Sequence, residues 1–390
     1  MKDHGDLFIR PPIQRISIHC PPDRCFHLLS GALVLKLQTI DRLDAGVDSH
    51  LVLGGLDPRA EAQAVQELLR KIANENGIAS FESAETVTLS LFGGTLSVGA
   101  ADPGAKIVIT AEDDTGLFRL QQIVLGLSSH HNVALAPEWS RSWPDRHSPN
   151  LKVAQVVHVE QVSPGFRRVR LRSDGFRDLE DSALHVRLLI PPRDRAPIWP
   201  WLDDNGRQIW PEGDDALHRP VYTFRMIDPA AGIGDVDIFL HDGGRVTEWS
   251  ETAAPGEVIG TMGPIGKSLP ACDWVALFGD ETALPAIARH LETLPADTRG
   301  KAFVHLQDLR DRQDLTAPAG VEVEWITGKG EPLLDAMRGL KIPETSRFIW
   351  FASEKSQCQT VRAYLRDDLG MTRDETHVTA YWTRATTATD

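Results

Sequence analysis

The periodicity of the sequence changes at about residue 270, and this change limits the folds that the larger part of the chain can adopt. From residue 151 to about 270, short runs of alternating apolar and polar residues are separated by Pro and Gly, with one helical stretch at 245–254. Many strands with almost no helix predict a β-barrel. After residue 270 strands alternate with helices, which predicts a parallel, doubly wound α/β sheet with ligands beyond the carboxyl ends of its strands.

The same patterns place the individual elements. The expected barrel strands are 151–162, 166–173, 184–192, 219–227, 235–241 and 257–264. The expected strands of the α/β sheet are 274–280, 301–307, 321–327, 347–353 and 376–382, and its helices are 282–294, 331–340 and 355–370.

The pattern of residues 1–140 predicts a small α+β domain that precedes the barrel and the α/β sheet. Its expected elements are a helix at 64–75, a strand region at 86–98 with a Gly-Gly break, a strand at 106–112 and a helix at 116–132. The Pro-, Ser- and charge-rich segment 137–150 has neither periodicity, so we place a linker at 141–150. The predicted domains are therefore 1–140, 151–270 for the barrel and 271–390 for the α/β sheet.

Composition and charge exclude several classes of protein. The chain has 390 residues and a net charge of −14, which disfavours nucleic acid as a partner and means that an anionic substrate needs local positive charge. No window approaches the roughly 18 apolar residues of a membrane span, and charges and prolines replace the apolar core of a secretory signal near the start. The four cysteines are scattered without a Cys-x-x-Cys pair. We therefore expect a cytoplasmic location, no membrane insertion and no metal site.

One barrel strand, 219-RPVYTFR-225, carries residues suited to a flat, charged ligand. Arg219 is able to pair with a pyrophosphate, the ring of Tyr222 to stack on an isoalloxazine, and the Thr223 hydroxyl to bond its edge. Alternation along the strand places Tyr222 and Thr223 on opposite faces of the pleat. The other interpretation is an edge strand with surface arginines.

A second candidate is 279-GDETALPA-286, at an expected strand-to-helix turn. Backbone amides at the helix start, with Thr282 as the cap, suit a dinucleotide phosphate, provided that Asp280 and Glu281 point away from it. An ordinary capped helix has the same sequence features. Two weaker candidates are the 263-GPIGKS-268 loop, which is alternatively an interdomain turn, and 381-YW-382, which either covers a flavin face or packs internally.

Residues 151–384 resemble the siderophore-interacting proteins, a family of flavin-containing ferric-siderophore reductases with a ferredoxin-reductase-like arrangement of domains. The strings that carry the resemblance are 185-HVRLLIPP-192, the Trp-rich 198-IWPWLDDNGRQIWPEGDDALHRPVYTFR-225, 235-DVDIFLH-241, 255-PGEVIGTMGPIG-266, 279-GDETALPAIAR-289 and 380-AYW-382. The region before the linker is similar to an uncharacterised small domain that often precedes such reductases, which adds architecture and no chemistry.

The resemblance implies an FAD site shared by several motifs. Arg219 would hold the FAD phosphates and Tyr222 and Thr223 the isoalloxazine, with a second loop formed by His241, Gly243, Gly244, Thr261, Gly263 and Gly266. The nicotinamide side would be lined by Thr282, Ala283 and Pro285, and the opposite flavin face by Tyr381 and Trp382. A hydride would pass from NADH or NADPH to the flavin and single electrons to siderophore-bound Fe(III), so no side chain is expected to act as a nucleophile or general acid.

The implied substrate is a ferric siderophore, and anionic triscatecholates call for a basic rim near the flavin. Lys267, Arg245 and Arg384 are the candidates because they adjoin the matched motifs. The chain departs from the family pattern where it reads Gly243-Gly244-Arg245, Ser353-Glu354 and Ala380.

The electron donor and the function class have alternatives. Arg310 and Arg312 suit the 2′-phosphate of NADPH, whereas Asp308 and Asp311 favour NADH or offset those charges. A flavoprotein that takes electrons from a ferredoxin or reduces another small acceptor has the same motifs. A non-catalytic siderophore- or iron-binding protein is the alternative from another class.

Overall fold

The computed structural model describes residues 14–18, 58–76, 78–83, 85–91, 93–100, 105–130, 143, 145–180, 184–266, 269–344 and 346–384. The chain forms two compact units. The first consists of residues 1–150 and 199–211, and the second of residues 151–198 and 212–390. The chain therefore passes between the units three times. Among the described residues, no helix combines the length and apolar character needed to span a bilayer.

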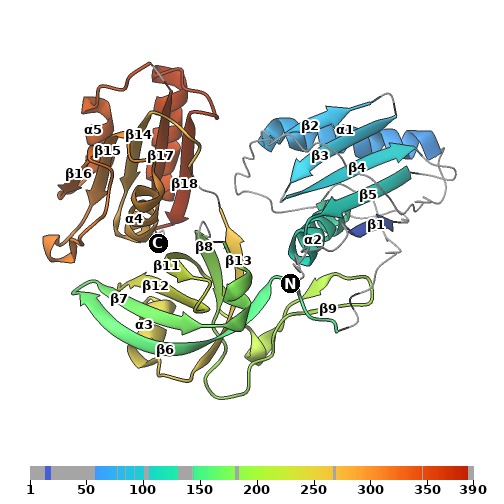
Figure 1. The fold of residues 1–390 in the computed structure, drawn as a ribbon, viewed down its shortest axis with the longest axis horizontal. Helices are drawn as coiled ribbons and strands as arrows, with labels where there is room; N and C mark the ends of the chain where they lie inside the picture. Colours follow the sequence, from blue (N-terminus) through green and yellow to red (C-terminus); the bar gives the residue numbers. More distant parts are fainter. Residues whose placement is uncertain are drawn as a thin grey trace, which may run out of the picture. The chain divides into compact units, whose positions relative to one another are not determined.

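The first unit contains a five-stranded antiparallel sheet with two helices on one face (Figure 1). The strand order is β1-β5-β4-β3-β2, with β1 at Gln14–Ile18, β2 at Ser80–Glu82, β3 at Thr86–Leu91, β4 at Gly94–Ala100 and β5 at Ala105–Ala111. The helices are α1 at Pro58–Asn76 and α2 at Asp114–His130. The predicted helices are confirmed, and the predicted strand region at 86–98 is found as two strands, β3 and β4, that form a hairpin turning at the Gly-Gly break.

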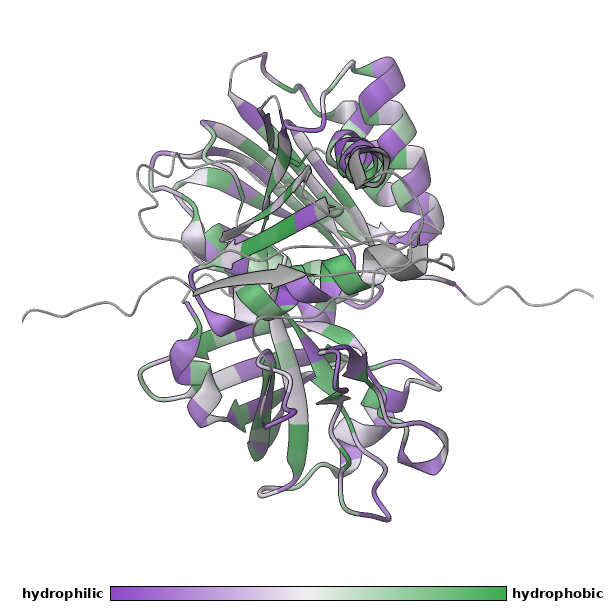
Figure 2. Ribbon diagram, turned by 90° about the vertical axis from the view of Figure 1, so that its right-hand side faces the viewer, coloured by the Kyte–Doolittle hydropathy of each residue, from purple (hydrophilic) through white to green (hydrophobic). Residues whose placement is uncertain are grey.

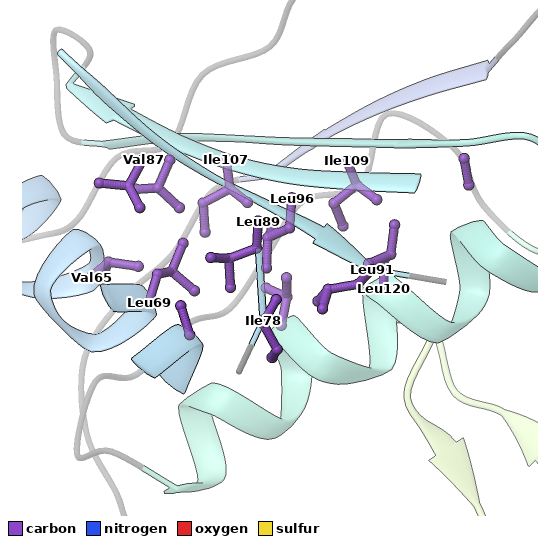
Figure 3. Close-up of a cluster of buried hydrophobic side chains, with 14 of the residues drawn as sticks. Val65, Leu69, Ile78, Val87, Leu89, Leu91, Leu96, Ile107, Ile109 and Leu120 are labelled. Carbon is purple, nitrogen blue, oxygen red and sulfur yellow. The ribbon is translucent and has the colours of Figure 1, made fainter. Parts of the chain in front are cut away.

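The core of this unit lies between the helices and the sheet. Alternate residues of β3, β4 and β5 point toward α1 and α2, and Figure 3 shows their side chains interleaved with Val65, Leu69 and Leu120 of the helices. On the opposite face, cross-strand hydroxyl pairs join Thr88 to Ser97 at 2.8 Å and Thr95 to Thr110 at 2.6 Å. The period of two along each strand thus separates an apolar face from a polar one.

A hairpin that interrupts the barrel sequence belongs to this first unit. Residues 199–211, here called the arm, contain β9 at Trp201–Leu202 and β10 at Gln208–Ile209. The Gln122 side chain of α2 holds the arm at two points, because its Nε2 donates to the Gly206 carbonyl at 2.7 Å and its Oε1 accepts from the Gln208 amide at 3.2 Å. The Leu202 amide also donates to the Arg146 carbonyl at 2.8 Å.

Gly206 is the arm residue whose replacement should separate the arm from α2. Its φ is +75°, and an added Cβ would lie 2.5 Å from Gln121 Nε2. Gln121 is fully buried and accepts a 2.6 Å bond from Trp143 Nε1, so its side chain is not free to retreat. In Gly206→Ala we expect hydrogen exchange at the Leu202 and Gln208 amides to accelerate on the order of tenfold, as about 1.4 kcal/mol would produce.

Gly213→Ala is the matched control for that prediction. Gly213 has a similar φ of +61°, but an added Cβ there meets nothing within 4 Å. Both variants carry the left-handed backbone strain of alanine, and only Gly206→Ala adds the collision. Equal exchange rates in the two variants would show that the collision with Gln121 does not displace the arm.

The second unit begins with a closed, antiparallel six-stranded barrel. The strands follow the order β11-β12-β7-β6-β13-β8 and close between β8 and β11. Their bounds are Leu151–Ser163 for β6, Phe166–Arg172 for β7, His185–Leu189 for β8, Val221–Asp228 for β11, Ile233–Phe239 for β12 and Val258–Ile265 for β13. The helix α3 spans Arg245–Thr252. Apolar and polar residues alternate along these strands (Figure 2), and the predicted barrel is confirmed.

The rest of the unit is a parallel sheet with the order β16-β15-β14-β17-β18 and helices on both faces. The strands are β14 at Trp274–Gly279, β15 at Arg299–His305, β16 at Gly320–Ile326, β17 at Arg347–Glu354 and β18 at Thr376–Trp382. Helix α4, Leu284–Thr293, packs on one face, whereas α5, Pro332–Gly339, and α6, Lys355–Ala363, pack on the other. The strand order reverses between β14 and β17, which is the topological switch point where ligands of such sheets bind.

Polar contacts, one of them to the buried Asp311, join the barrel and the parallel sheet. Asp311, which follows β15, accepts bonds from Ser163 Oγ at 2.7 Å and from the Gly165 amide at 2.6 Å in the β6–β7 turn. Arg225 of β11 forms a 2.8 Å ion pair with Glu292 of α4. These contacts fix the end of the barrel against the α4 face of the sheet.

Candidate functional site

The turn after β14 is organised around the carboxylate of Asp280, which is 4% exposed. One carboxylate oxygen accepts from the Thr282 amide and hydroxyl, and the other from Ser353 Oγ at 2.7 Å and Trp382 Nε1 at 2.8 Å. Asp280 thus ties the ends of β14, β17 and β18 together at the switch point. These donors hold the carboxylate in the protein interior, but they are neutral, so it keeps its negative charge.

The predicted cap of this turn is wrong. Asp280, not Thr282, is the N-cap of the short 3-10 turn Glu281–Ala283, because its side chain accepts the Thr282 amide. The physical reason is that the Asp280 carboxylate, two residues before Thr282, accepts the Thr282 amide through a strong, charge-assisted bond. Glu281 points inward, where its Oε1 accepts the Gln307 amide at 2.5 Å and burial raises the pKa of its carboxyl.

The other two residues expected on the nicotinamide side lie in the protein interior. Ala283 is fully buried in the core between the sheet and α4, and Pro285 is buried at the start of α4. Thr282 is partly exposed, and its hydroxyl is bonded to Asp280. Only Thr282 of the three presents side-chain surface at this turn.

The departure at Ser353-Glu354 adds internal hydrogen bonds at the carboxyl end of β17. Ser353 donates to Asp280, and Glu354 accepts from the Ser356 amide at 2.6 Å and the Arg384 amide at 3.2 Å. The bond from the Ser356 side chain lowers the pKa of the Glu354 carboxyl to about 2. A glycine in place of Ser353 would remove one of the four donors to Asp280.

The two aromatic residues at the end of β18 contact different partners. Trp382 is 38% exposed and donates to Asp280, while the Arg384 guanidinium lies 5.9 Å from the centre of its indole. Tyr381 points to the barrel, where its hydroxyl lies 3.1 Å from His185 Nε2. Burial raises the pKa of the Tyr381 phenol. Ala380, which directly precedes Tyr381 in the strand, is exposed.

On β11 the predicted alternation is confirmed. Tyr222 packs against the barrel core, and burial raises the pKa of its phenol. Thr223, on the other face, is 3% exposed, and its Oγ1 lies 3.1 Å from His185 Nδ1. His185 therefore contacts both Thr223 of the barrel and Tyr381 of the sheet.

Two arginines lie side by side at the edge of this face. Arg187 of β8 donates to the Arg219 carbonyl at 2.8 Å, and burial together with the positive charge of Arg219 lowers the pKa of the Arg187 guanidinium. Arg219 itself is exposed. Like charges held this close favour the binding of an anion between or beside them.

The turn between β12 and α3 offers backbone amides without a side-chain cap. Gly243 has a φ of +70° and open space where a Cβ would stand, whereas a Cβ on Gly244 would lie 2.8 Å from the His241 ring. Gly244 is the N-cap of α3 and makes no side-chain bond to the first turn. Free amides at a helix start, next to an exposed Arg245, suit a phosphate.

Arg245 also borders a pocket of about 460 Å³ on the barrel. The basic residues that line the pocket are Arg193, His218 and Arg245, and the acidic ones are Asp214 and Glu248. Burial and the neighbouring Arg245 lower the pKa of the His218 imidazole. The apolar part of the lining consists of Ile190, Pro191, Pro192, Ala216 and Trp249.

The loop after β13 contributes backbone rather than side chains. Thr261 is 2% exposed and donates to the Lys152 carbonyl at 3.1 Å, so its hydroxyl is used inside the barrel. A Cβ on Gly266, whose φ is +83°, would lie 2.6 Å from His185 Cδ2, and at Gly263 it would lie 3.1 Å from the His185 carbonyl. These glycines make room for His185. Lys267 lies outside the described residues.

The predicted 2′-phosphate arginines already have partners. Arg310 forms a forked ion pair with Asp308, and the Arg312 guanidinium lies 5.5 Å from the centre of the Trp325 indole. Asp311 faces the barrel and not the end of β15. Of the four residues, Asp308 and Arg310 form the exposed pair nearest the carboxyl end of β15.

Sequence reasoning missed His185, Arg187 and the role of Asp280. His185 and Arg187 stand in 185-HVRLLIPP-192, and their spacing of two along a strand places both side chains on one face. For Asp280 the sequence signal was its position two residues before Thr282 at the expected start of a helix, which is typical of an N-cap residue.

The donor set fits an FAD molecule. The Arg187–Arg219 pair and the uncapped start of α3 match a pyrophosphate, and the open Cβ position at Gly243 allows close approach. Tyr222 and Thr223 lie on the strand that continues from Arg219.

Two family descriptions match the second unit of the chain. The Siderophore-interacting FAD-binding domain matches residues 155–268, and the Siderophore-interacting protein description matches residues 272–385. The first match confirms the predicted FAD-binding barrel and the second the order of the two domains.

Curated relatives and a solved structure cover the same region. The chain is 26% identical over 248 residues to the ferric vibriobactin reductase ViuB of Vibrio cholerae, covering 60% of this chain and 89% of the relative. It is 29% identical over 227 residues to the NADPH-dependent ferric-chelate reductase of Escherichia coli, covering 54% and 86%. The crystal structure of a siderophore utilization protein from T. fusca superposes with a TM-score of 0.52 at 30% identity, covering 62% of this chain and 95% of that one.

Proposed function

The chain belongs to the siderophore-interacting protein family, and from this we propose that it is an FAD-containing reductase that releases iron from ferric siderophores with electrons from NAD(P)H. The observation that carries the proposal is that the matched FAD-binding barrel and the switch point of the parallel sheet lie in one compact unit. The relatives named for reduction of ferric vibriobactin and of ferric chelates support the substrate class.

In this proposal FAD is held by Arg219, by Tyr222 and Thr223 on β11, by the turn from His241 to Gly244, and by the loop from Thr261 to Gly266. When bound, FAD would supply the means to take a hydride from the nicotinamide and to deliver single electrons to Fe(III), which is the substrate's metal. Arg219 and the α3 amides bind the phosphates, while Tyr222 and Thr223 orient the ring. Thr282 and Trp382 border the nicotinamide side of the switch point.

The substrate residues of the proposal are the exposed arginines at the edges of this site. Arg384 lies two residues after Trp382, the last residue of β18, and Arg245 borders the barrel pocket. Since the whole chain carries a net charge of −14, these local positive charges attract an anionic complex against the overall field. Catecholate complexes are the most anionic ferric siderophores and are the substrates we expect to bind best.

The test is a reduction assay on the purified full-length protein. We expect the protein to be yellow or to take up added FAD, and to reduce a ferric catecholate under anaerobic conditions when NADH or NADPH is supplied, with a ferrous chelator as the trap. Comparing the two nucleotides decides the donor, and adding a reduced ferredoxin instead tests the alternative donor. A protein that neither contains nor takes up FAD contradicts the proposal.

The site assignment is tested by Arg219→Ala. The loss of one charge-assisted contact to a phosphate should weaken FAD binding by on the order of 10- to 100-fold, since such bonds contribute roughly 1.5–3 kcal/mol. Flavin fluorescence titration measures the dissociation constant. Arg172→Ala, an exposed arginine on β7, is the control and should bind FAD as the wild type does. Unchanged affinity in Arg219→Ala would contradict the assignment.

A further inference from the structure

His185 is the one described side chain that bonds to both Thr223 and Tyr381, and neither the motifs nor the comparisons give it a role. It is the first residue of β8, paired with Thr223 on one neighbouring strand and with Ile265, the last residue of β13, on the other. Its ring is fixed on both faces, because Gly266 leaves only enough room for it and Tyr381 packs edge-on with ring centres 5.6 Å apart. The imidazole is therefore held in one orientation.

Each of the three polar groups has a limited number of hydrogen bonds to share. His185 Nδ1 lies 3.1 Å from Thr223 Oγ1 and Nε2 lies 3.1 Å from the Tyr381 hydroxyl. A threonine hydroxyl has one donor and two acceptor positions, so the proton that lies between His185 and Thr223 decides whether the Thr223 hydrogen is left for a ligand.

The imidazole is neutral, so one of its nitrogens donates and the other accepts. Burial and the nearby His377 lower the pKa of His185 to about 4, and the groups that face the ring are Thr223, Tyr381 and His377, with no carboxylate bonded to either nitrogen. Two proton arrangements then satisfy the same heavy-atom geometry.

In the first arrangement, Tyr381 donates to Nε2 and the Nδ1 proton is donated to Thr223, so the Thr223 hydrogen remains available to a ligand. In the second, Thr223 donates to Nδ1 and Nε2 donates to Tyr381. Thr223 then has only a lone pair left for a ligand. Both arrangements hold three protons, on Tyr381, on Thr223 and on the imidazole, so no net proton is gained or lost.

We propose that His185 is a positioning residue whose tautomer decides whether Thr223 offers a donor or an acceptor to the flavin ring edge. The inference rests on the proposed function, since it concerns the ligand assigned to Thr223. An isoalloxazine edge nitrogen is a bare acceptor when oxidised and carries a hydrogen after two-electron reduction. Because Thr223 matches either state by exchange of tautomers, the site binds both redox forms with similar strength.

Two conservative variants separate this role from a purely structural one. His185→Asn keeps a polar group at the Nδ1 position and so the contact with Thr223, whereas His185→Gln places its amide at the Nε2 position and keeps the contact with Tyr381. We expect His185→Asn to leave the ratio of the dissociation constants for oxidised and reduced FAD within about twofold of wild type. In His185→Gln the ratio should change about tenfold, which is a shift of about 30 mV in the two-electron potential.

The opposite order of the two variants would show that His185 only anchors Tyr381, and would overturn the proposal. A second readout is independent of the variants: in wild-type protein labelled with ¹⁵N at histidine, the Nδ1 and Nε2 shifts of His185 should exchange their donor and acceptor values when bound FAD is reduced with dithionite. An unchanged tautomer overturns the proposal while leaving the proposed function intact. A wild-type protein that binds no FAD overturns both.

Discussion

Replacing Asp280 by alanine is expected to lower the free energy of unfolding of the second unit by about 4 kcal/mol. The carboxylate is 4% exposed and accepts bonds from Thr282, Ser353 and Trp382. Bonds to a charged group contribute about 1.5–3 kcal/mol each, and the buried donors left behind add a desolvation cost. The urea midpoint, followed by tryptophan fluorescence, measures the loss, and Trp382 itself should report it because its indole donor is one of those released.

Asp280→Asn separates the contributions of the individual hydrogen bonds to that loss of stability. An amide oxygen can replace the carboxylate oxygen that accepts from Thr282, but its NH₂ group then faces Trp382 Nε1, which only donates. We expect a stability between those of the wild type and Asp280→Ala. Asp297→Ala, at an exposed position in the turn after α4, is the control for removing a negative charge. If Asp280→Ala and Asp297→Ala unfold at the same urea concentration, Asp280 does not join the three strands.

The elements of the second unit were predictable because each follows from a local period. The alternation in β6 and β7 and the spacing of Leu284, Ile287 and Leu291 in α4 are properties of neighbouring residues, and the core formed where those patterns require it. The parallel order with its switch point follows from the alternation of strands and helices. These conclusions needed no long-range information.

The arm was not predictable by the same reasoning. Residues 199–211 have no period of their own, and nothing in the sequence around Trp201 or Gln208 indicates that they pack with α2 and not with the barrel. The deciding contacts are between Gln122 and backbone groups of the arm, about 85 residues away. Bonds to backbone leave no signature in the types of the residues that receive them.

The candidate site was predicted in part for a similar reason. The residues with distinctive chemistry, such as Arg219, Tyr222 and Thr223, were identified from one strand. His185 was not, because its importance arises from Thr223 and Tyr381, which lie on other strands and, for Tyr381, 196 positions away. Thr282 was misassigned as a cap because the sequence does not reveal that Asp280 turns inward to collect four donors.

Acidification from pH 7 to pH 5 is expected to lower the stability of the second unit by roughly 4 kcal/mol through two buried histidines. Burial lowers the pKa of His185 to about 4 and that of His290 to about 3, compared with 6.5 for an unfolded histidine. His290 is 2% exposed, lies against Trp350 with ring centres 5.1 Å apart, and has Nε2 without a hydrogen-bond partner. A proton on that ring would be a buried charge with no acceptor.

The sign follows from which state binds protons first. Between pH 6.5 and about 4 the unfolded chain protonates both histidines while the folded protein keeps them neutral, so protons favour unfolding in that window. Stability is therefore complete above pH 6.5 and falls by about 1.4 kcal/mol per pH unit for each histidine below it. Glu281 opposes part of this loss at the acid end, because burial raises the pKa of its carboxyl. The depressed pKa of Glu354 acts only below about pH 4.5.

The measurement is the slope of unfolding free energy against pH between 5 and 6.5, since the slope is independent of any packing defect that a substitution causes. His290→Gln removes one of the two groups, so we expect its slope to be smaller than that of the wild type by about 1.4 kcal/mol per pH unit. His158→Gln, whose side chain is 61% exposed on β6, should keep the wild-type slope. A His290→Gln slope equal to that of His158→Gln would mean that His290 is protonated in the folded protein, which would require a water molecule or a carboxylate to reach its Nε2 through the core.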